Sequence, residues 1–253
     1  MVADSANSPI MVWSYSYSGA RQVQDHLAAG GDLACTQATG IVPLCATAEE
    51  TWGRIEGRPG PRISRLAAAS IQRLINGQLM VLLAGAGKTR WFELATASAA
   101  AAASILRIFP GTGFACVHRS CLDVIRIGVQ THIWGLQGTA AGSYLQFYPG
   151  NNVAALAAYW ADWTAMLLAF EADHPDAAHR IRYEDVTADP DQALKGIRAS
   201  LGLSHGTLAG LPEPDDGWPA QTGLDVPVEM IPQELRRYIH GLCEQLCYPP
   251  PGG

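Results

Sequence analysis

The sequence predicts an α/β fold, a three-layer sandwich in which helices cover both faces of a central parallel sheet. Short uncharged runs such as 10–15 (IMVWSY) are typical of strands that are buried on both faces. Helical segments follow such runs in regular alternation, which is the pattern of βαβ units. The chain has 253 residues and is 48% hydrophobic, so it can bury the core of such a domain. We therefore expect residues 1–253 to form a single α/β domain.

The N-terminal part of the chain contains the first two strand-like segments. The strand at 10–15 is followed by a loop and a helix over 16–30 that ends at a pair of glycines. A short extended piece is predicted at 32–36 (DLACT). A helix is expected to start at Thr47, because Thr47 and Glu50 have the spacing of a capping box.

The middle of the chain predicts two further strand–helix units. An amphipathic helix over 63–77 should end at an Asn-Gly pair, since such pairs commonly close helices. The apolar run 78–85 (QLMVLLAG) is then predicted to be a strand, and 89–107 a helix. The run 113–118 (GFACVH) predicts another parallel strand, with a helix over 120–131.

The last part of the chain begins with a long aromatic and glycine-rich stretch at 134–152, which is typical of a substrate loop or lid. A long helix is expected at 153–175 and a strand at 179–186. Two further helices are expected at 189–203 and 232–248, with a Pro/Gly/Asp loop at 211–227 between them. Because ligands of parallel sheets bind at the carboxyl ends of the strands, we expect the functional residues to follow strands.

Composition excludes several classes of function. The net charge is −6 and no basic block occurs, which disfavours a nucleic-acid partner or an anionic membrane. The six cysteines form no C-x-x-C pair and no His/Cys set with zinc spacing, so we expect reduced thiols and no metal. Residues 1–13 lack the features of a signal peptide, and the apolar run 95–106 is shorter than the ~20 residues of a membrane span. A cytoplasmic location is expected.

The stretch 85–89 (GAGKT) resembles a nucleotide-binding phosphate loop, whose full pattern is G-x-x-x-x-G-K-S/T. The first glycine of that pattern would fall at position 82, which is Leu82. A leucine there continues the apolar run instead of starting the turn that wraps a phosphate. A true ATP or GTP site is therefore disfavoured, and Lys88 is left as a cation at the end of a predicted strand.

Three segments together resemble one known family. The segment 13–35 is similar to an opening strand, a P-R/K-S-G-T-T/S loop and a helix, and 87–124 is similar to a later strand that ends in R-D/N-P-x-D-V. The segment 180–203 contains a close match to R-Y-E-D-L, D-P and a helix ending in L-G-L. In this order the segments resemble bacterial sulfotransferases that use 3′-phosphoadenosine 5′-phosphosulfate (PAPS), which implies their P-loop-like sulfotransferase architecture.

The resemblance implies a cofactor role for several residues. The loop that would bind the 5′-phosphosulfate, here called the donor loop, covers 16–21, and its implied contacts are Tyr17, Ser18, Gly19, Ala20 and Arg21. Backbone amides between a strand and a helix N-terminus suit a phosphate or sulfonate oxygen. Arg119 would hold the 3′-phosphate and Tyr183 would contact adenine. From the residues alone, a loop that binds nothing, a salt-bridged Arg119 and a core tyrosine remain alternatives.

Three residues are predicted to take part in the chemistry. Sulfuryl transfer needs positioning and charge stabilisation more than covalent catalysis. Arg21 would supply a fixed charge, Lys88 would be the cation on the leaving side, and the two should converge on one anion site. His132 is the candidate base, because histidine titrates near neutrality. A solvated Lys88 and a structural His132 are the alternatives. The expected walls of an acceptor pocket are Trp134, Tyr144, Phe147 and Tyr148.

The chain departs from the family pattern at the positions that bind the donor. Tyr17 stands where a lysine or arginine stabilises the bridging oxygen, and Ala20 replaces a hydroxyl residue. Ile127 stands where a serine would contact the 3′-phosphate, and Ser120-Cys121 replace the acidic residue and the proline. Another cation, Arg21 first, would have to compensate if the chain still transfers sulfonate.

The function implied is transfer of a sulfuryl group from PAPS to a hydroxyl of a small metabolite in bacterial secondary metabolism, with adenosine 3′,5′-bisphosphate as product. One alternative is a protein with a vestigial donor loop that acts on a sulfated substrate, for example by expelling sulfate during cyclisation, or that partners an intact sulfotransferase. A P-loop kinase-like enzyme is the second alternative. A homodimer or a heteromer with another sulfotransferase-like subunit is left open.

Overall fold

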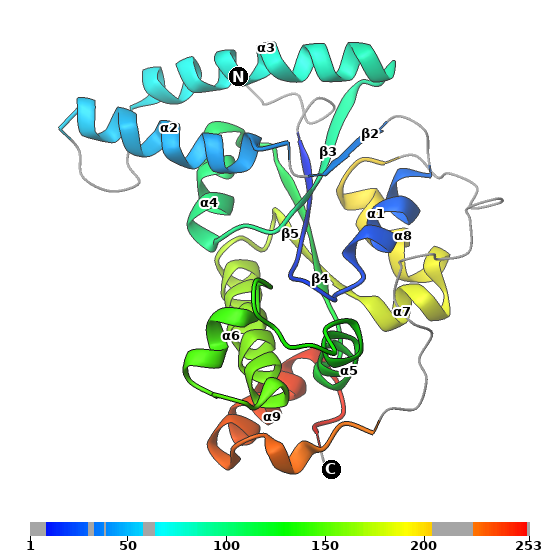
Figure 1. The fold of residues 1–253 in the computed structure, drawn as a ribbon. Coiled ribbons are helices and arrows are strands. Elements are labelled where there is room, and N and C mark those ends of the chain that lie inside the picture. Colours follow the sequence, from blue (N-terminus) through cyan, green and yellow to red (C-terminus); the bar gives the residue numbers. More distant parts are fainter. Residues whose placement is uncertain (1–8, 30–32, 38, 58–63, 204–224, 252–253) are drawn as a thin grey trace.

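The computed structural model describes residues 9–29, 33–37, 39–57, 64–203 and 225–251. Its sheet has five parallel strands in the order β2-β3-β1-β4-β5. The strands are β1 (Ile10–Trp13), β2 (Leu33–Gln37), β3 (Arg90–Ala95), β4 (Gly113–His118) and β5 (Ala178–Arg182). The central parallel sheet confirms the predicted α/β fold class (Figure 1).

Helices cover both faces of this sheet. They are α1 (Ala20–Ala28), α2 (Ile41–Ile55), α3 (Arg65–Ala86), α4 (Ala99–Ile108), α5 (Cys121–Thr131), α6 (Asn152–Asp173), α7 (Tyr183–Ala188), α8 (Pro190–Ser200) and α9 (Gln233–Leu246). Two short 3-10 helices are η2 (Gly142–Gln146) and η3 (Val228–Met230). In Figure 1, α1, α7 and α8 lie on one side of the sheet, and α4 and α6 lie on the other.

Alternation along the central strand explains the two hydrophobic layers. Ile10 and Val12 of β1 belong to the core under α1, α7 and α8. Met11 and Trp13 belong to the larger core, which contains residues of α2 to α6 and α9. Because side chains on a strand point alternately to opposite faces, four consecutive apolar residues require cover on both sides. This confirms the predicted three layers.

Several predicted elements are confirmed with small changes at their ends. The strands expected at 10–15 and 113–118 are β1 and β4, and the helix expected at 120–131 is α5. The helix expected over 189–203 is α8, which begins at Pro190. Most of the loop predicted at 211–227 lies outside the described residues.

Within residues 63–107, the end of the first helix and the elements predicted at 78–98 were wrong. Helix α3 does not end at Asn76-Gly77 but continues to Ala86, so the predicted strand at 78–85 is helical. The predicted helix at 89–107 consists of β3, a short connection and α4. The physical reason is a stripe of buried residues at spacing four along α3, namely Ala67, Ile71, Ile75 and Leu79. This stripe continues past Gly77, which is not among the described glycines with left-handed backbone, so no helix-ending turn forms there.

Two boundaries also differ from the prediction. Helix α2 begins at Ile41 after Gly40, so the capping box expected at Thr47 is not a helix start. The strand expected over 179–186 ends at Arg182, and Tyr183 begins the short helix α7. The chain therefore turns at Tyr183, directly after the carboxyl end of β5.

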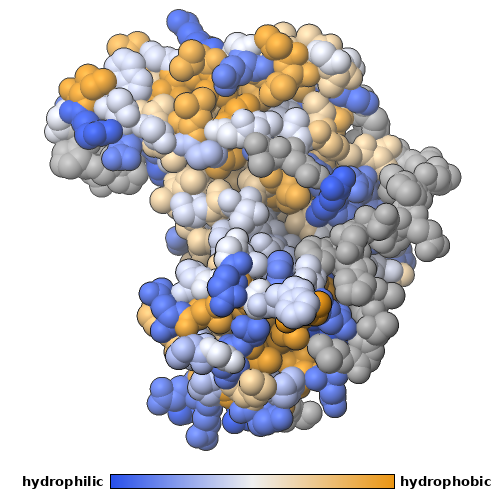
Figure 2. Space-filling view, viewed as in Figure 1, coloured by the Kyte–Doolittle hydropathy of each residue, from blue (hydrophilic) through white to orange (hydrophobic). Residues whose placement is uncertain are grey.

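Helices α3 and α6 are both long and apolar enough to cross a membrane by composition, but they differ in burial. Helix α6 is a core helix, with 67% of its most apolar window buried, against 22% for α3. Helix α3 exposes Leu66, Leu74 and Val81, and apolar residues are visible over α2 and α3 in Figure 2. The predictions about membranes and oligomers stay predictions.

Candidate functional site

The loop after β1 forms the centre of the site at the carboxyl edge of the sheet. Ser14 is buried, and its hydroxyl donates to the carbonyl of Val117 in β4 at 2.8 Å. The loop then turns at two residues with left-handed backbone, Tyr17 (φ 71°) and Gly19 (φ 78°). Gly19 is the N-cap of α1, so the amides of the first turn of α1 face the end of this loop. A helix N-terminus in this place favours an anion.

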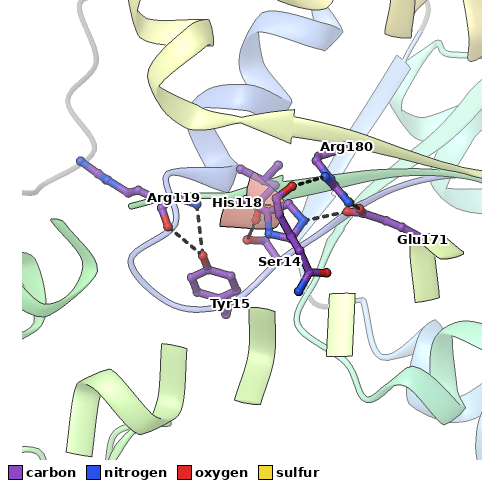
Figure 3. A network of polar contacts seen from close by, with 8 residues as sticks. Ser14, Tyr15, His118, Arg119, Glu171 and Arg180 are labelled. Carbon is purple, nitrogen blue, oxygen red and sulfur yellow. Dashed lines mark hydrogen bonds and ion pairs between the residues drawn. The ribbon is translucent and has the colours of Figure 1, made fainter. Parts of the chain in front are cut away.

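Side chains from two other elements saturate the backbone at Arg119, which follows β4. The Tyr15 hydroxyl accepts from the Arg119 amide at 3.1 Å and donates to the Arg119 carbonyl at 3.2 Å. The Trp160 indole of α6 donates to the same carbonyl at 2.8 Å. In Figure 3 the Tyr15 hydroxyl points at this backbone, while the Arg119 side chain extends away from it. The position of Arg119 is therefore fixed before any ligand binds.

Arg119 is 4% exposed, and its guanidinium is only partly satisfied by the described residues. Its Nη1 donates to the carbonyl of Tyr17 at 3.3 Å, and its centre lies 4.1 Å above the ring of Tyr183. Its buried Nε has no hydrogen-bond partner among the described residues. Buried guanidinium donors are normally paired, so this one fits an anionic ligand such as a phosphate.

Tyr183 lies directly against the donor loop. A Cβ at Gly19 would be 2.1 Å from the Tyr183 ring, so only glycine fits the space as well as the backbone angle. The Tyr183 hydroxyl donates to Gln22 Oε1 at 2.7 Å. The ring thus packs between Gly19 and Arg119, and any planar group of a ligand would have to approach it from its remaining surface.

Glu184 holds the start of α5. Its Oε1 accepts from the Ser120 amide at 2.8 Å, and its Oε2 accepts from the Tyr248 hydroxyl at 2.6 Å. The Arg182 guanidinium lies 4.5 Å above the Tyr248 ring. The carboxylate of Glu184 therefore takes the place at the N-terminus of α5 that an anion would otherwise occupy, which leaves the Arg119 side chain and α1 for a ligand.

A buried polar network lies beneath this edge. His118 of β4 is fully buried, and its Nε2 lies 2.7 Å from Glu171 Oε1 of α6. The other Glu171 oxygen accepts from Arg180 Nε at 2.7 Å, and Arg180 also donates to the carbonyl of Gln245. In Figure 3 Arg119 lies to one side of His118, and Glu171 and Arg180 lie to the other. The network joins β4, α6, β5 and the end of α9.

Side chains of residues 132–151, here called the acceptor segment, and of α6 face the donor loop. The Tyr17 and His132 rings meet edge to face, with centroids 5.9 Å apart. The Tyr17 hydroxyl forms a hydrogen bond with Thr139, and burial raises the pKa of the Tyr17 phenol, so this group is neutral at pH 7. The Tyr159 hydroxyl accepts from the Ser16 amide at 2.8 Å.

Most predicted site residues come together here. The residues that meet at the carboxyl edge are Tyr17, Ser18, Gly19, Ala20, Arg119, Tyr183 and His132. Arg21 is the second residue of α1 and is exposed. Among the predicted acceptor walls, Trp134 is 93% exposed and Phe147 67% exposed, so neither closes a pocket within the described residues.

Lys88 lies at the opposite edge of the sheet, so the predicted convergence with Arg21 was wrong. Lys88 precedes β3, whose first residue Arg90 pairs with Leu33 at the start of β2. The six residues of β3 span about 20 Å at a rise of about 3.3 Å per residue. Lys88 lines a separate groove of about 790 Å³, together with residues of α3 and the turn at Phe109–Gly111. It has no place in the chemistry at the carboxyl edge.

The GAGKT stretch is also not a phosphate loop. It ends a helix and leads into a strand, which is the reverse of the strand-to-helix order of a phosphate loop. The amides of Gly87 and Lys88 donate to the carbonyls of Ala84 and Leu83 at 3.2 and 3.0 Å, which closes α3. These amides are therefore used inside the protein, and the kinase-like alternative loses its basis.

Sequence reasoning missed four residues that build the site. None of Glu184, Thr139, Tyr159 and Tyr248 was among the predicted site residues. Tyr248 is 64 residues away from Glu184, so no sequence spacing joins them. Only the R-Y-E-D match at 182–185 carried a signal, because it placed a carboxylate directly after the implied adenine contact.

Comparison with known proteins gives a family and a fold. Residues 9–206 match the model of the family described as Sulfotransferase family. A sulfotransferase domain from the curacin biosynthetic pathway is 15% identical with a TM-score of 0.61, covering 97% of this chain and 99% of that one. The sulfotransferase from Alicyclobacillus acidocaldarius is 12% identical with a TM-score of 0.59, covering 96% and 97%.

A third solved structure is similar to the same extent. The sulfotransferase domain from the Synechococcus PCC 7002 olefin synthase is 14% identical with a TM-score of 0.56, covering 97% of each chain. The comparison with curated proteins gave no significant match. At these identities the solved structures show the fold alone.

Proposed function

Because the chain belongs to the sulfotransferase family, we propose that it transfers a sulfuryl group from PAPS to a hydroxyl group of a small metabolite. The observation that carries this proposal is Arg119, a buried guanidinium at the carboxyl edge whose Nε has no partner among the described residues. A buried cation without a full set of partners is costly unless a ligand completes it. The 3′-phosphate of PAPS has the charge and the acceptor oxygens for that role.

The donor side of the reaction uses the residues around α1. The first-turn amides of α1 and the Ser18 hydroxyl would hold sulfonate and 5′-phosphate oxygens, with Arg21 as the nearest exposed cation. PAPS supplies the sulfuryl group and a stable leaving bisphosphate. Tyr17 is neutral, so it would not balance charge on the bridging oxygen, and we assign that task to Arg21.

The acceptor side uses His132. Its ring lies against Tyr17 at the mouth of the donor loop, where an acceptor hydroxyl would approach the sulfur. In the step proposed, the acceptor oxygen forms a bond to sulfur while the bond from sulfur to the bridging oxygen breaks. The hydroxyl proton passes to His132 and the electron pair leaves with adenosine 3′,5′-bisphosphate.

A biosynthetic setting is part of the proposal. Two of the similar structures are described as domains of the curacin biosynthetic pathway and of an olefin synthase. This supports an acceptor that is an intermediate or product of secondary metabolism. The described residues contain no group of three or more His, Cys, Asp or Glu that could hold a metal ion, and the proposed chemistry needs none.

A second candidate function is favoured by the donor loop itself. Tyr17 replaces the expected cation, and the Tyr183 ring fills the space next to Gly19. If these features exclude PAPS, the same loop and Arg21 would stabilise a sulfate group that leaves from an already sulfated substrate. This candidate predicts release of inorganic sulfate without consumption of PAPS.

One assay separates the two candidates. The protein is incubated with PAPS labelled with ³⁵S and a panel of phenols, alcohols and their sulfate esters, and products are identified by mass spectrometry. Transfer of label with formation of adenosine 3′,5′-bisphosphate supports the first function. Sulfate release from an ester without PAPS consumption supports the second, and the absence of PAPS binding contradicts the first.

A further inference from the structure

We propose that Tyr17 is a positioning residue that ties the donor loop to the acceptor segment and thereby sets acceptor binding. From the sequence, Tyr17 is predicted to contact PAPS, because a donor-binding cation stands at this position in the family pattern. The contacts of the side chain point instead to the acceptor side. The inference rests on the proposed function, since it names what this residue does in that site.

The backbone of Tyr17 is the first observation. Its φ of 71° lies in the left-handed region, which residues with a Cβ rarely adopt. Tyr17 is also 5% exposed, although it lies in a loop. A strained, buried residue persists where the surrounding contacts hold it, so the side chain is held by something specific.

Two contacts of the side chain are with the acceptor segment. The ring meets the ring of His132 edge to face at 5.9 Å. The hydroxyl forms a hydrogen bond with Thr139, in a turn closed by the bond from the Thr139 amide to the Leu136 carbonyl at 3.0 Å. Tyr17 thus contacts the acceptor segment at His132, where the segment begins, and at the turn of residues 136–139.

The main chain of Tyr17 contacts the donor side. Its carbonyl accepts from Nη1 of Arg119 at 3.3 Å. A phosphate that binds Arg119 competes for the guanidinium donors and changes this bond. Because the same residue holds the acceptor segment, donor binding is expected to alter the order of residues 132–151.

The acceptor segment has a second attachment that provides a matched control. The Tyr144 hydroxyl donates to Asp162 Oδ2 of α6 at 2.9 Å, and the Tyr144 and Tyr159 rings are 5.8 Å apart. Tyr144→Phe therefore loosens the same segment by one hydroxyl without touching Tyr17. If donor binding alters the order of the acceptor segment through Tyr17, Tyr144→Phe should still show that effect.

The experiment measures amide hydrogen exchange of residues 132–151 with and without adenosine 3′,5′-bisphosphate. The variants are Tyr17→Gly, Tyr17→Phe, Thr139→Val and Tyr144→Phe, with Tyr238→Phe on the exposed side of α9 as neutral control. Glycine accepts the φ of position 17, so it removes the side chain while keeping the backbone of the loop. Phenylalanine keeps the ring and removes the hydroxyl that bonds to Thr139.

Tyr17→Phe should raise exchange in the segment about fivefold, the factor for one net hydrogen bond. Thr139→Val should raise it more, because this change also removes the bond from the Thr139 hydroxyl to the Leu136 carbonyl at 2.7 Å. Tyr17→Gly should raise it further and abolish the response to the nucleotide, whereas Tyr144→Phe should keep that response. With an acceptor identified, Tyr17→Phe should raise the acceptor KM and leave the affinity for the bisphosphate within about twofold.

Unchanged hydrogen exchange of residues 132–151 in Tyr17→Gly would overturn the proposal. A loss of nucleotide affinity in this variant without a change in exchange would also overturn it, because Tyr17 would then act in donor binding. Failure of the proposed function looks different. In that case the wild-type protein binds no bisphosphate, but the exchange difference between Tyr17→Gly and wild type still shows whether Tyr17 holds the segment.

Discussion

The two edges of the parallel sheet each carry a glycine turn next to a cation, and they differ in the direction in which the chain passes through the turn. At the carboxyl edge Gly19 opens α1, so the amides of its first turn face the ligand side, and the Ala20 amide donates to the Ser18 hydroxyl at 3.3 Å. At the amino edge Gly87 closes α3, and the amides there are bonded to α3 carbonyls. A helix attracts anions at its start and repels them at its end. The letters G-x-G-K-T alone do not contain this difference.

The edges also differ in how their cations are held. Arg119 is fixed through its backbone by Tyr15 and Trp160, and Glu184 fixes the next residue. Lys88 lines the groove below α3 instead. Preorganised donors stabilise charge at little reorganisation cost, so the carboxyl edge is the edge where chemistry is expected.

The largest effect is expected for Arg119→Ala. It should lower kcat/KM for PAPS by about 10²–10³, because one preorganised charged donor is lost. Arg119→Lys should recover little, since a lysine lacks the planar fork and the stacking on Tyr183. Thermal unfolding of both variants serves as control. Full activity in a folded Arg119→Ala protein would remove the residue from the site.

Arg21→Ala tests whether this residue compensates for the missing cation at position 17. Turnover should fall by about 10²-fold while the fold is unaffected, because Arg21 is exposed on the first turn of α1. Steady-state kinetics with PAPS give the result. Wild-type turnover would show that another group stabilises the leaving oxygen.

Glu184→Ala should have an intermediate effect. The change leaves the Ser120 amide and the Tyr248 hydroxyl without their partner, and bonds to a charged group contribute about 1.5–3 kcal/mol. We expect about a tenfold loss of affinity for adenosine 3′,5′-bisphosphate, with a smaller loss in Tyr248→Phe. An affinity unchanged in both variants would show that this contact does not position Arg119.

Much of the carboxyl edge was predictable because local pattern and topology agree there. β1 and β4 are short uncharged runs followed by helices, and parallel pairing brings their carboxyl ends together. Arg119 and the loop at Tyr17 could therefore be placed side by side from the sequence. The roles of Thr139 and Tyr248 could not, because their contacts depend on tertiary packing between distant segments.

The amino edge was predicted wrongly for a physical reason. An apolar run after an Asn-Gly pair is as consistent with an exposed helix as with a strand, since short apolar runs are ambiguous. The spacing of Ile71, Ile75 and Leu79 was the signal for a continuous helix, and it was outweighed by the Asn-Gly pair at 76–77. Because Lys88 follows the wrongly predicted strand, it was predicted to lie at the carboxyl edge of the sheet.

The smallest effect is expected for Lys88→Ala. Lys88 lies at the amino edge, farther from the carboxyl edge than a Debye length of about 8–10 Å, so salt screens its charge there. The value of kcat/KM should therefore stay within about twofold of wild type. The same assay as for Arg21→Ala provides the direct comparison. A tenfold or larger loss would mean that the groove below α3 takes part in the function.

The central claim is that an adenosine bisphosphate binds at the carboxyl edge through Arg119. Isothermal titration calorimetry of adenosine 3′,5′-bisphosphate with wild type, Arg119→Ala and Lys88→Ala tests it most directly. The account predicts binding to wild type and to Lys88→Ala with equal affinity, and its loss in Arg119→Ala. No binding to wild type, or loss in Lys88→Ala with retention in Arg119→Ala, would contradict it.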